Sequence, residues 1–263
     1  MNTVIETLKN RTSLRTYADR PVSQEHLDII LDCAMRAPTA GNMMLYSVII
    51  IEDKKKKEIL SRTCDNQPFI AKAPLVLIFA ADYQKWYDYY QAGNVEDYCR
   101  QEKIPFSYPS EANLMLAACD ALIAAQNAVI AGESLGIGSC YIGDIMERYE
   151  EHKKLLNLPD YVFPVAMLCM GYYPDNYTKR LRPRFKRDYV VFKDSYRRLN
   201  EEEIKDMFRS LEESFRAENP YNAKNYAQLH YARKTGAPFA REMTRSVREA
   251  LKVWNGDNKK RYD

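Results

Sequence analysis

The apolar positions of the chain fall into two spacings, which predict helices interleaved with short buried strands. Runs of consecutive apolar and β-branched residues predict strands at 46–51, 73–81, 138–143 and 163–173. Helical spacing predicts helices near 4–8, after the N-cap candidate Ser23, up to about Arg62, over 144–156 as an exposed helix, and after the N-cap candidate Asn200. Helices that alternate with strands indicate an α/β or α+β sandwich.

Three other regions carry weaker patterns. Residues 114–138 form a long apolar stretch, but Asp120, Gln126, Asn127 and Glu133 interrupt it, so we expect a central helix buried on most sides and no membrane span. Residues 83–108 are rich in tyrosine and irregular, with room for one helix. The charged region after Arg180 has too few large apolar residues for a core of its own, so it must dock on its own body or on a partner subunit.

Composition narrows the classes of function. The chain has 263 residues with 39 basic and 36 acidic ones, and this near balance argues against a nucleic-acid partner. Its six cysteines form no C-x-x-C pair and, with the three histidines, no metal-ligand spacing, so no metal is expected. The N-terminus is charged and amphipathic, unlike a secretory signal, and reduced cysteines fit a cytoplasmic location.

Common catalytic signatures do not occur. No strand is followed by G-x-G-x-x-G, there is no P-loop, and no Ser-His-Asp or Cys-His arrangement stands out. His26 and His152 lie in helices that look amphipathic, so we interpret the histidines as surface or hydrogen-bonded core residues. No catalytic side chain is therefore assigned.

One octapeptide, "NRTSLRTY" at 10–17, suggests a binding site. Arg11, Ser13 and Arg15 occupy alternating positions, and two guanidinium groups with a hydroxyl between them can hold a phosphate. By itself the octapeptide fits a solvated turn better than a binding site.

The order of several motifs settles this choice. "NRTSLRTY", "RAPTAGN", "AAQNAVIAGESLGIGSCYIGDI" and "FPVAMLCMGYYPD" resemble, in this order and spacing, the nitroreductase/flavin reductase family. The stretches "LRPRFKRDYVVFKDSY" and "YARKTGAPFAREMTRSVREAL" look like the C-terminal extension of its larger, oxygen-insensitive members. The resemblance implies an α+β three-layer sandwich, with a central, mainly antiparallel sheet flanked by helices, in a homodimer that binds FMN at the subunit interface.

The resemblance also implies which residues bind the cofactor. Residues matching Arg11, Thr12, Ser13 and Arg15 hold the phosphate, ribityl chain and pyrimidine edge, and Arg182 and Arg184 close on the phosphate. The loop of Pro38, Thr39, Ala40, Gly41 and Asn42 lies against the isoalloxazine of the neighbouring subunit. Asn66 and Gln67 match an amide that bonds the polar edge of the flavin, and Cys140, Tyr141, Ile142 and Gly143 match a turn whose backbone lies near N5 and O4.

Two departures concern the substrate. The family commonly continues with Gln, Pro and Trp after the position of Asn42, whereas this chain has Met44, Leu45 and Tyr46, which removes one possible flavin hydrogen bond. The tyrosines of 83–108 either stack on flat substrates or pack on the protein's own helices.

The function expected from the resemblance is that of an FMN-dependent NAD(P)H oxidoreductase. Hydride passes through flavin N5, in a ping-pong cycle, to nitroaromatic, quinone or flavin acceptors, with the flavin carrying the chemistry. The alternatives are a relative with another reaction, namely dehalogenation or flavin fragmentation, and a flavin-binding or regulatory protein without turnover. We expect residues 1–194 to form the FMN-binding domain and residues 195–263 a helical extension that packs on the dimer.

Overall fold

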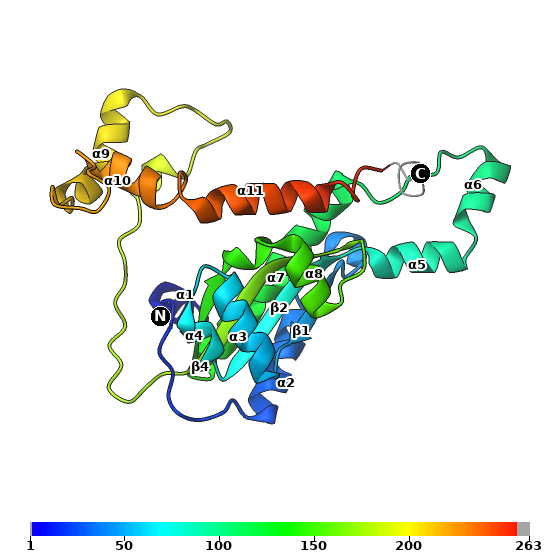
Figure 1. The fold of residues 1–263 in the computed structure, drawn as a ribbon, viewed down its shortest axis with the longest axis horizontal. Helices are drawn as coiled ribbons and strands as arrows, with labels where there is room; N and C mark the ends of the chain where they lie inside the picture. Colours follow the sequence, from blue (N-terminus) through cyan, green and yellow to red (C-terminus); the bar gives the residue numbers. More distant parts are fainter. Residues whose placement is uncertain (1, 257–263) are drawn as a thin grey trace. The chain divides into compact units, whose positions relative to one another are not determined.

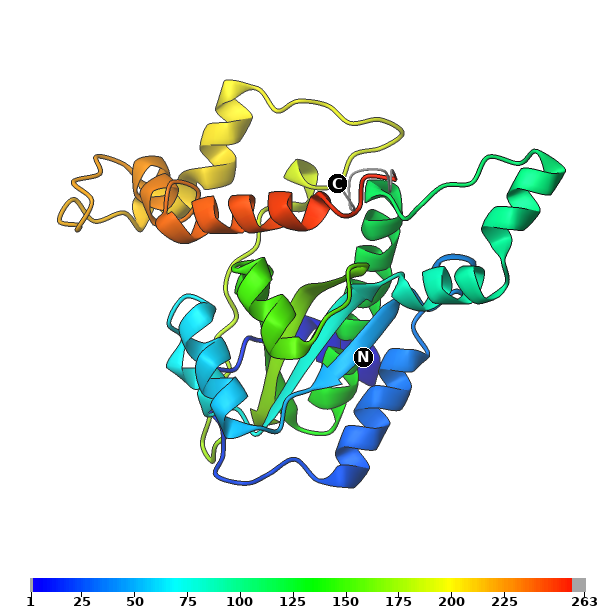
Figure 2. The same ribbon diagram turned by 45° about the vertical axis from the view of Figure 1, so that its right-hand side comes forward.

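The fold is that of a computed structural model, which describes residues 2–256 (Figures 1 and 2). The chain separates into two compact units. The first runs up to Lys179 and resumes at Glu242, and the second comprises Arg180–Arg241. This division falls at other positions than the predicted boundary after residue 194, and the packing of residues 195–263 on a dimer stays a prediction.

A single antiparallel sheet lies at the centre of the first unit. Its strands are β1 (Tyr46–Ile50), β2 (Leu75–Asp82), β3 (Ile137–Ile142) and β4 (Val162–Tyr172). They pair in the order β1-β2-β4-β3, and every neighbouring pair is antiparallel. The predicted strands and the predicted antiparallel sheet are confirmed.

Strand β2 shows why both faces of this sheet are covered. All eight of its residues are buried. Leu77 and Phe79 belong to one hydrophobic core, whereas Val76 and Ile78 belong to a second core on the opposite face. The period of two therefore supplies apolar side chains to both faces, and helices must cover each of them.

Helices α7 (Glu111–Ser134) and α2 (Gln24–Met35) cover the first face, and α1 (Thr3–Asn10) packs against α7. Ser23 caps α2 as predicted, because its side chain accepts a hydrogen bond from the backbone N–H of His26. The second face is covered by α3 (Lys54–Thr63), α4 (Pro68–Ala71), the 3₁₀ turn η2 (Gly143–Met146) and α8 (Tyr149–Leu156). The three-layer sandwich is confirmed (Figure 1).

Two predictions about helices are corrected. The exposed helix expected over 144–156 is the turn η2 followed by α8, and Tyr149 and His152 of α8 are buried. Helix α7, long and apolar enough to span a bilayer, has only half of its most apolar window buried. It was expected to be buried on most sides, but it leaves an apolar stripe exposed: Met115, Leu116, Leu122 and Ile123.

The tyrosine-rich region contains two helices where one was expected. Helices α5 (Gln84–Ala92) and α6 (Val95–Glu102) extend away from the sheet (Figures 1 and 2). Some of its rings pack internally, since Tyr87 lies 4.9 Å from Tyr161, but Tyr89 and Tyr98 are exposed. Tyr87 therefore packs within the protein, whereas Tyr89 and Tyr98 remain available to stack on a flat substrate.

The second unit contains η3 (Arg187–Tyr189), α9 (Glu201–Glu213), α10 (Tyr226–Arg233) and the start of α11 (Pro238–Leu251). Asn200 caps α9 as predicted, in a capping box with Glu203. Lys186 and Tyr189 both bond Asp206, which ties the segment before α9 to that helix.

The end of α11 and the residues after it belong to the first unit. The Ser246 hydroxyl donates to the carbonyl of Met146 and accepts from the backbone N–H of Tyr149, and Trp254 is fully buried against Tyr161. Helical spacing places Met243, Val247, Leu251 and Trp254 on one apolar stripe, which we expected to need the other subunit. Within its own chain Trp254 is buried, whereas Met243, Val247 and Leu251 are half-buried.

Candidate functional site

The arginine-containing segment runs along the edge of the sheet. Ser13 forms a parallel bridge with Ser139 of β3, and the N–H of Leu14 donates to the Ser139 carbonyl at 2.9 Å. Leu14 is completely buried, so it anchors the segment. Because side chains alternate along an extended chain, Arg11, Ser13 and Arg15 share the side opposite Leu14.

The arginines of this segment lie close to Cys140 of β3. Burial raises the pKa of the Cys140 thiol, while the charge of Arg15, the Ser13 hydroxyl and the charge of Arg11 oppose that increase. The Arg15 guanidinium lies 5.6 Å from the centre of the Phe69 ring. Two positive charges therefore converge beside β3, at the start of α4.

Buried polar atoms in this cluster are unsatisfied. Among the described residues, Nη1 of Arg11 and Oγ of Ser139 are buried and have no hydrogen-bond partner. Thr12 is on the Leu14 side of the segment, where its hydroxyl is near Tyr173. Leaving a charged donor buried without a partner is costly. A multivalent anion such as a phosphate would provide acceptors for the groups of Arg11 and Ser139, so the cluster fits the phosphate of FMN.

The 38–45 loop, which contains the turn η1 (Ala40–Asn42), is organised by a different set of contacts. Asp120 of α7 accepts hydrogen bonds from the Thr39 hydroxyl, from the N–H of Ala40 at 3.0 Å and from the N–H of Leu45 at 3.2 Å. The indole N–H of Trp86 donates to the Met43 carbonyl at 2.8 Å. Among the described residues, these hydrogen bonds join the 38–45 loop to α7 and α5. They do not join it to the cluster that contains Arg11 and Arg15, which we call the arginine cluster.

Asn66 and Gln67 lie between α3 and α4. Asn66 is exposed, with a left-handed backbone. The Gln67 amide donates to Oδ2 of Asp144 at 2.8 Å and to the Cys64 carbonyl at 2.9 Å, so both of its N–H groups are used inside the protein. Its oxygen is the atom left to accept from a ligand.

The end of β3 leads into η2. Ile142 is buried and Gly143 is exposed, which leaves the Gly143 backbone accessible. Burial raises the pKa of Tyr141 to about 12, although the positive charge of Arg11 acts to lower that pKa. The phenol is therefore neutral at physiological pH. Its hydroxyl donates to Gln126 at 3.3 Å.

A carboxyl pair at η2, formed by the half-buried Asp144 and the buried Glu147, was not found from the sequence. Glu147 is only 4% exposed, and burial, followed by the charge of Asp144, raises its pKa to about 8. His152 lies behind the pair, with Nδ1 2.9 Å from the Ile145 carbonyl and Nε2 2.8 Å from the Thr63 hydroxyl. Burial lowers its pKa, so His152 is the hydrogen-bonded core residue that was expected.

The remaining predicted residues lie in the second unit. Arg182 and Arg184 are exposed in its irregular first segment. Their predicted contact with the phosphate stays a prediction.

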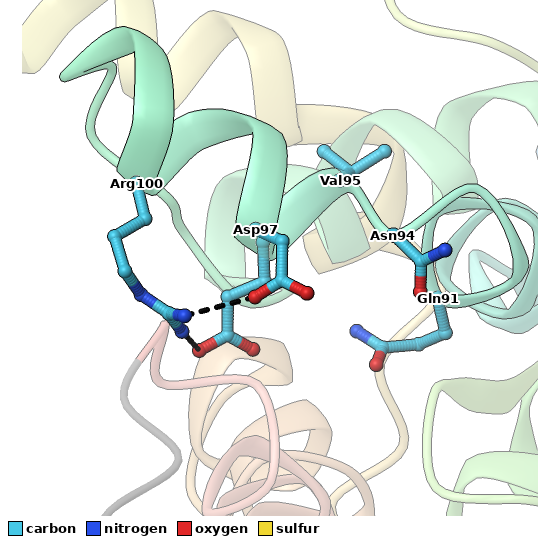
Figure 3. Close-up of a pocket in the computed structure, with 6 residues that line it drawn as sticks. Gln91, Asn94, Val95, Asp97 and Arg100 are labelled. Carbon is cyan, nitrogen blue, oxygen red and sulfur yellow. Dashed lines mark hydrogen bonds and ion pairs between the residues drawn. The ribbon is translucent and has the colours of Figure 1, made fainter.

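A polar hollow of about 190 Å³ lies elsewhere, between α5 and α6 (Figure 3). Arg100 in its wall is paired with Glu96 and Asp97. The positive charge is thereby neutralised, and none of the predicted cofactor residues lines the hollow.

The antiparallel three-layer sandwich places the chain in a known class. Residues 8–172 match the Nitroreductase family, and the chain belongs to that family. The FMN reductase [NAD(P)H] of Bacillus subtilis is 32% identical over 250 residues, which cover 92% of this chain and 96% of the relative. The FMN reductase (NADPH) of the same organism is 33% identical over 196 residues, 74% of this chain and 75% of the relative.

A solved structure extends this similarity to nearly the whole chain. The structure of B. megaterium NfrA2 superposes with a TM-score of 0.76 at 30% identity, covering 98% of this chain and 100% of the other. The expected family and fold are confirmed.

Proposed function

We infer that this protein is an FMN-dependent NAD(P)H oxidoreductase. The observation that carries the inference is the buried Nη1 of Arg11, which lacks a partner within residues 2–256 and lies in a cluster suited to a phosphate. Two relatives are named FMN reductases, and they match 92% and 74% of the chain.

The roles of the residues follow from their chemistry. Arg11 and Arg15 bind the phosphate, and the backbone N–H of Gly143 donates to the polar edge of the ring system. The Gln67 oxygen, whose amide is fixed by Asp144, accepts a hydrogen bond from the same edge. Bound FMN supplies the hydride-transfer chemistry between NAD(P)H and the acceptor, so no side chain needs to act as acid or base.

We further propose nitroaromatics, quinones or free flavins as acceptors, because exposed aromatic residues of α5 and α6 provide surface for flat molecules. Met44, which stands in place of the family's glutamine, is 38% exposed and adds an apolar side chain to the 38–45 loop. A cytoplasmic location fits the six cysteines, all of them free thiols.

We also propose a homodimer. The 38–45 loop is bonded to α7 and α5, whereas the arginine cluster lies along β3, and the resemblance assigns the two to flavins of different subunits. Each flavin site would therefore need both chains.

The purified protein itself tests this function. We expect a yellow protein whose visible absorbance is bleached by NADH or NADPH under anaerobic conditions and restored by an acceptor. Colour without bleaching would indicate a flavin-binding protein without turnover. A protein that stays colourless after incubation with FMN would contradict the proposal.

The arginine cluster is tested by Arg15→Ala. The loss of charge-assisted hydrogen bonds should weaken FMN binding by about 1.5–3 kcal/mol in a fluorescence titration, while the circular dichroism spectrum is unchanged. Arg100→Ala is the matched control, because Arg100 forms only exposed ion pairs on α6. Equal FMN affinity in the two variants would show that Arg15 does not bind the cofactor.

A further inference from the structure

A single buried carboxylate forms hydrogen bonds to both ends of the 38–45 loop. Asp120 lies in the middle of α7 and is 3% exposed. It accepts three hydrogen bonds, from the Thr39 hydroxyl and from the N–H groups of Ala40 and Leu45. These donors come from both ends of the loop, so one side chain fixes the distance between its ends.

The backbone of the loop needs such support. Gly41, Asn42 and Met44 have φ angles of 56°, 57° and 50°. Left-handed backbone is unfavourable for residues with a Cβ, particularly for a long side chain such as that of methionine. Conformations of this kind persist where the surrounding structure fixes them, and they are concentrated at ligand sites.

The Thr39 side chain is already engaged inside the loop. Its hydroxyl donates to Asp120 and accepts from the N–H of Met44 at 2.9 Å. Its single proton is therefore not free for a flavin. On the other side of the loop, the Trp86 indole holds the Met43 carbonyl.

We propose that Asp120 is a positioning residue for FMN: through Thr39, Ala40 and Leu45 it holds the 38–45 loop in the conformation that contacts the isoalloxazine. The inference rests on the proposed function. Thr39 then contributes to FMN binding through Asp120 and not by direct contact of its hydroxyl with the flavin.

A pair of Thr39 variants tests this role. Thr39→Val keeps the shape but loses the hydroxyl, whereas Thr39→Ser keeps the hydroxyl. We expect FMN affinity, measured by fluorescence titration, to fall roughly 3- to 30-fold in Thr39→Val and to stay within about twofold of wild type in Thr39→Ser. Equal affinities of Thr39→Val and wild type, or a Thr39→Ser as weak as Thr39→Val, would overturn the proposal.

Asn127→Ala is the matched control. Asn127 also lies on α7 and donates a hydrogen bond, to the Cys33 carbonyl at 3.1 Å, but it holds α2 and not the loop. We expect Asn127→Ala to lower the melting temperature of the apoprotein, as Thr39→Val does. Its FMN affinity should stay within about twofold of wild type. If Asn127→Ala lost as much FMN affinity as Thr39→Val, the loss would follow from lower stability of the protein in general, and the proposal would be overturned.

Asp120→Asn adds a coupling test. Combined with Thr39→Val it should bind FMN no more weakly than Asp120→Asn alone, because both changes disrupt the same contact. Additive losses of FMN affinity in the double variant would overturn the proposal. If Asp120→Asn does not fold, the comparison of Thr39→Val with Thr39→Ser tests the proposal by itself. Wild-type protein that binds no FMN would contradict the proposed function as well, whereas FMN binding that is unchanged in the variants would contradict this inference alone.

Discussion

At the scale of single residues, the site contains more charge than its own contacts neutralise. At the β3 edge, Nη1 of Arg11 is buried without a partner among the described residues, while the carboxyl group of Glu147, with Oε1 likewise unpartnered, is buried beside the carboxyl of Asp144. Both arrangements cost free energy of folding in the unliganded chain. Sites that bind charged cofactors commonly carry such perturbed groups.

The Glu147 carboxyl should make stability depend on pH. Its pKa is about 8 in the folded chain, against about 4.5 as the ordinary value, raised by burial and by Asp144 and Asp65 against Arg148. The folded state thus binds the extra proton between these values, and this contribution to stability is complete below pH 4.5 and lost as the pH rises through 8. The loss amounts to at most about 1.4 kcal/mol per pH unit.

Chemical denaturation of wild type and Glu147→Gln between pH 5 and 8.5 measures this effect. The variant should become more stable relative to wild type as the pH rises. The lowered pKa of His152 acts in the opposite sense below pH 6.5 in both proteins, so it cancels in the difference. A difference that does not change with pH would contradict the assignment.

At the scale of elements, residues 242–255, which comprise the end of α11 and the residues after it, connect several elements of the first unit. We call this segment the strap. Asn255 bridges Ser110 at the start of α7, and Arg245 of α11 pairs with Glu150 of α8 at 2.8 Å. The fully buried Trp254 packs its ring 5.5 Å from Tyr161. The strap therefore joins α7, α8 and the strand end at Tyr161.

We expect Trp254→Ala to destabilise the protein by about 3–5 kcal/mol, because it leaves a large cavity in the core. The Trp254 indole N–H has no partner among the described residues. Trp254→Phe, which removes this unsatisfied donor, should therefore cost under about 1.5 kcal/mol. Urea unfolding measures both values, and equal losses would show that cavity formation is not the cause.

At the scale of the whole molecule, two neighbouring helices each expose a group of apolar side chains. Helix α7 exposes Met115, Leu116, Leu122 and Ile123, and α1, which packs against it, exposes Val4, Ile5 and Leu8. Contiguous apolar surface of this kind indicates a protein interface. It is the surface on which we expect the second subunit to pack.

Leu122→Glu should therefore convert the proposed dimer into a monomer, since a buried charge without a partner is unfavourable at an interface. Ile104→Glu is the control, because Ile104 is 46% exposed, close to the 43% of Leu122, but lies beyond the end of α6. Sedimentation velocity measures the mass of each. A Leu122→Glu protein that remains dimeric would exclude the α7 face as the interface.

The sequence by itself determined the parts of this protein that depend on neighbours along the chain. The apolar runs placed the four strands, and Ser23 and Asn200 were recognised as N-caps, because strand periodicity and capping are local properties. The order of the motifs identified the family. The alternation of Arg11, Ser13 and Arg15 suggested an anion site, but the family resemblance was needed to prefer it over a solvated turn.

Only the tertiary structure decided the contacts between distant residues. Thr39 and Asp120 are 81 residues apart and Gln67 and Asp144 are 77 apart, so no local pattern relates them. The apolar composition of α7 likewise did not reveal which of its residues stay exposed. A helix of apolar residues has no polar face to mark its exposed side, so the packing of α2 and the sheet decides which side is buried.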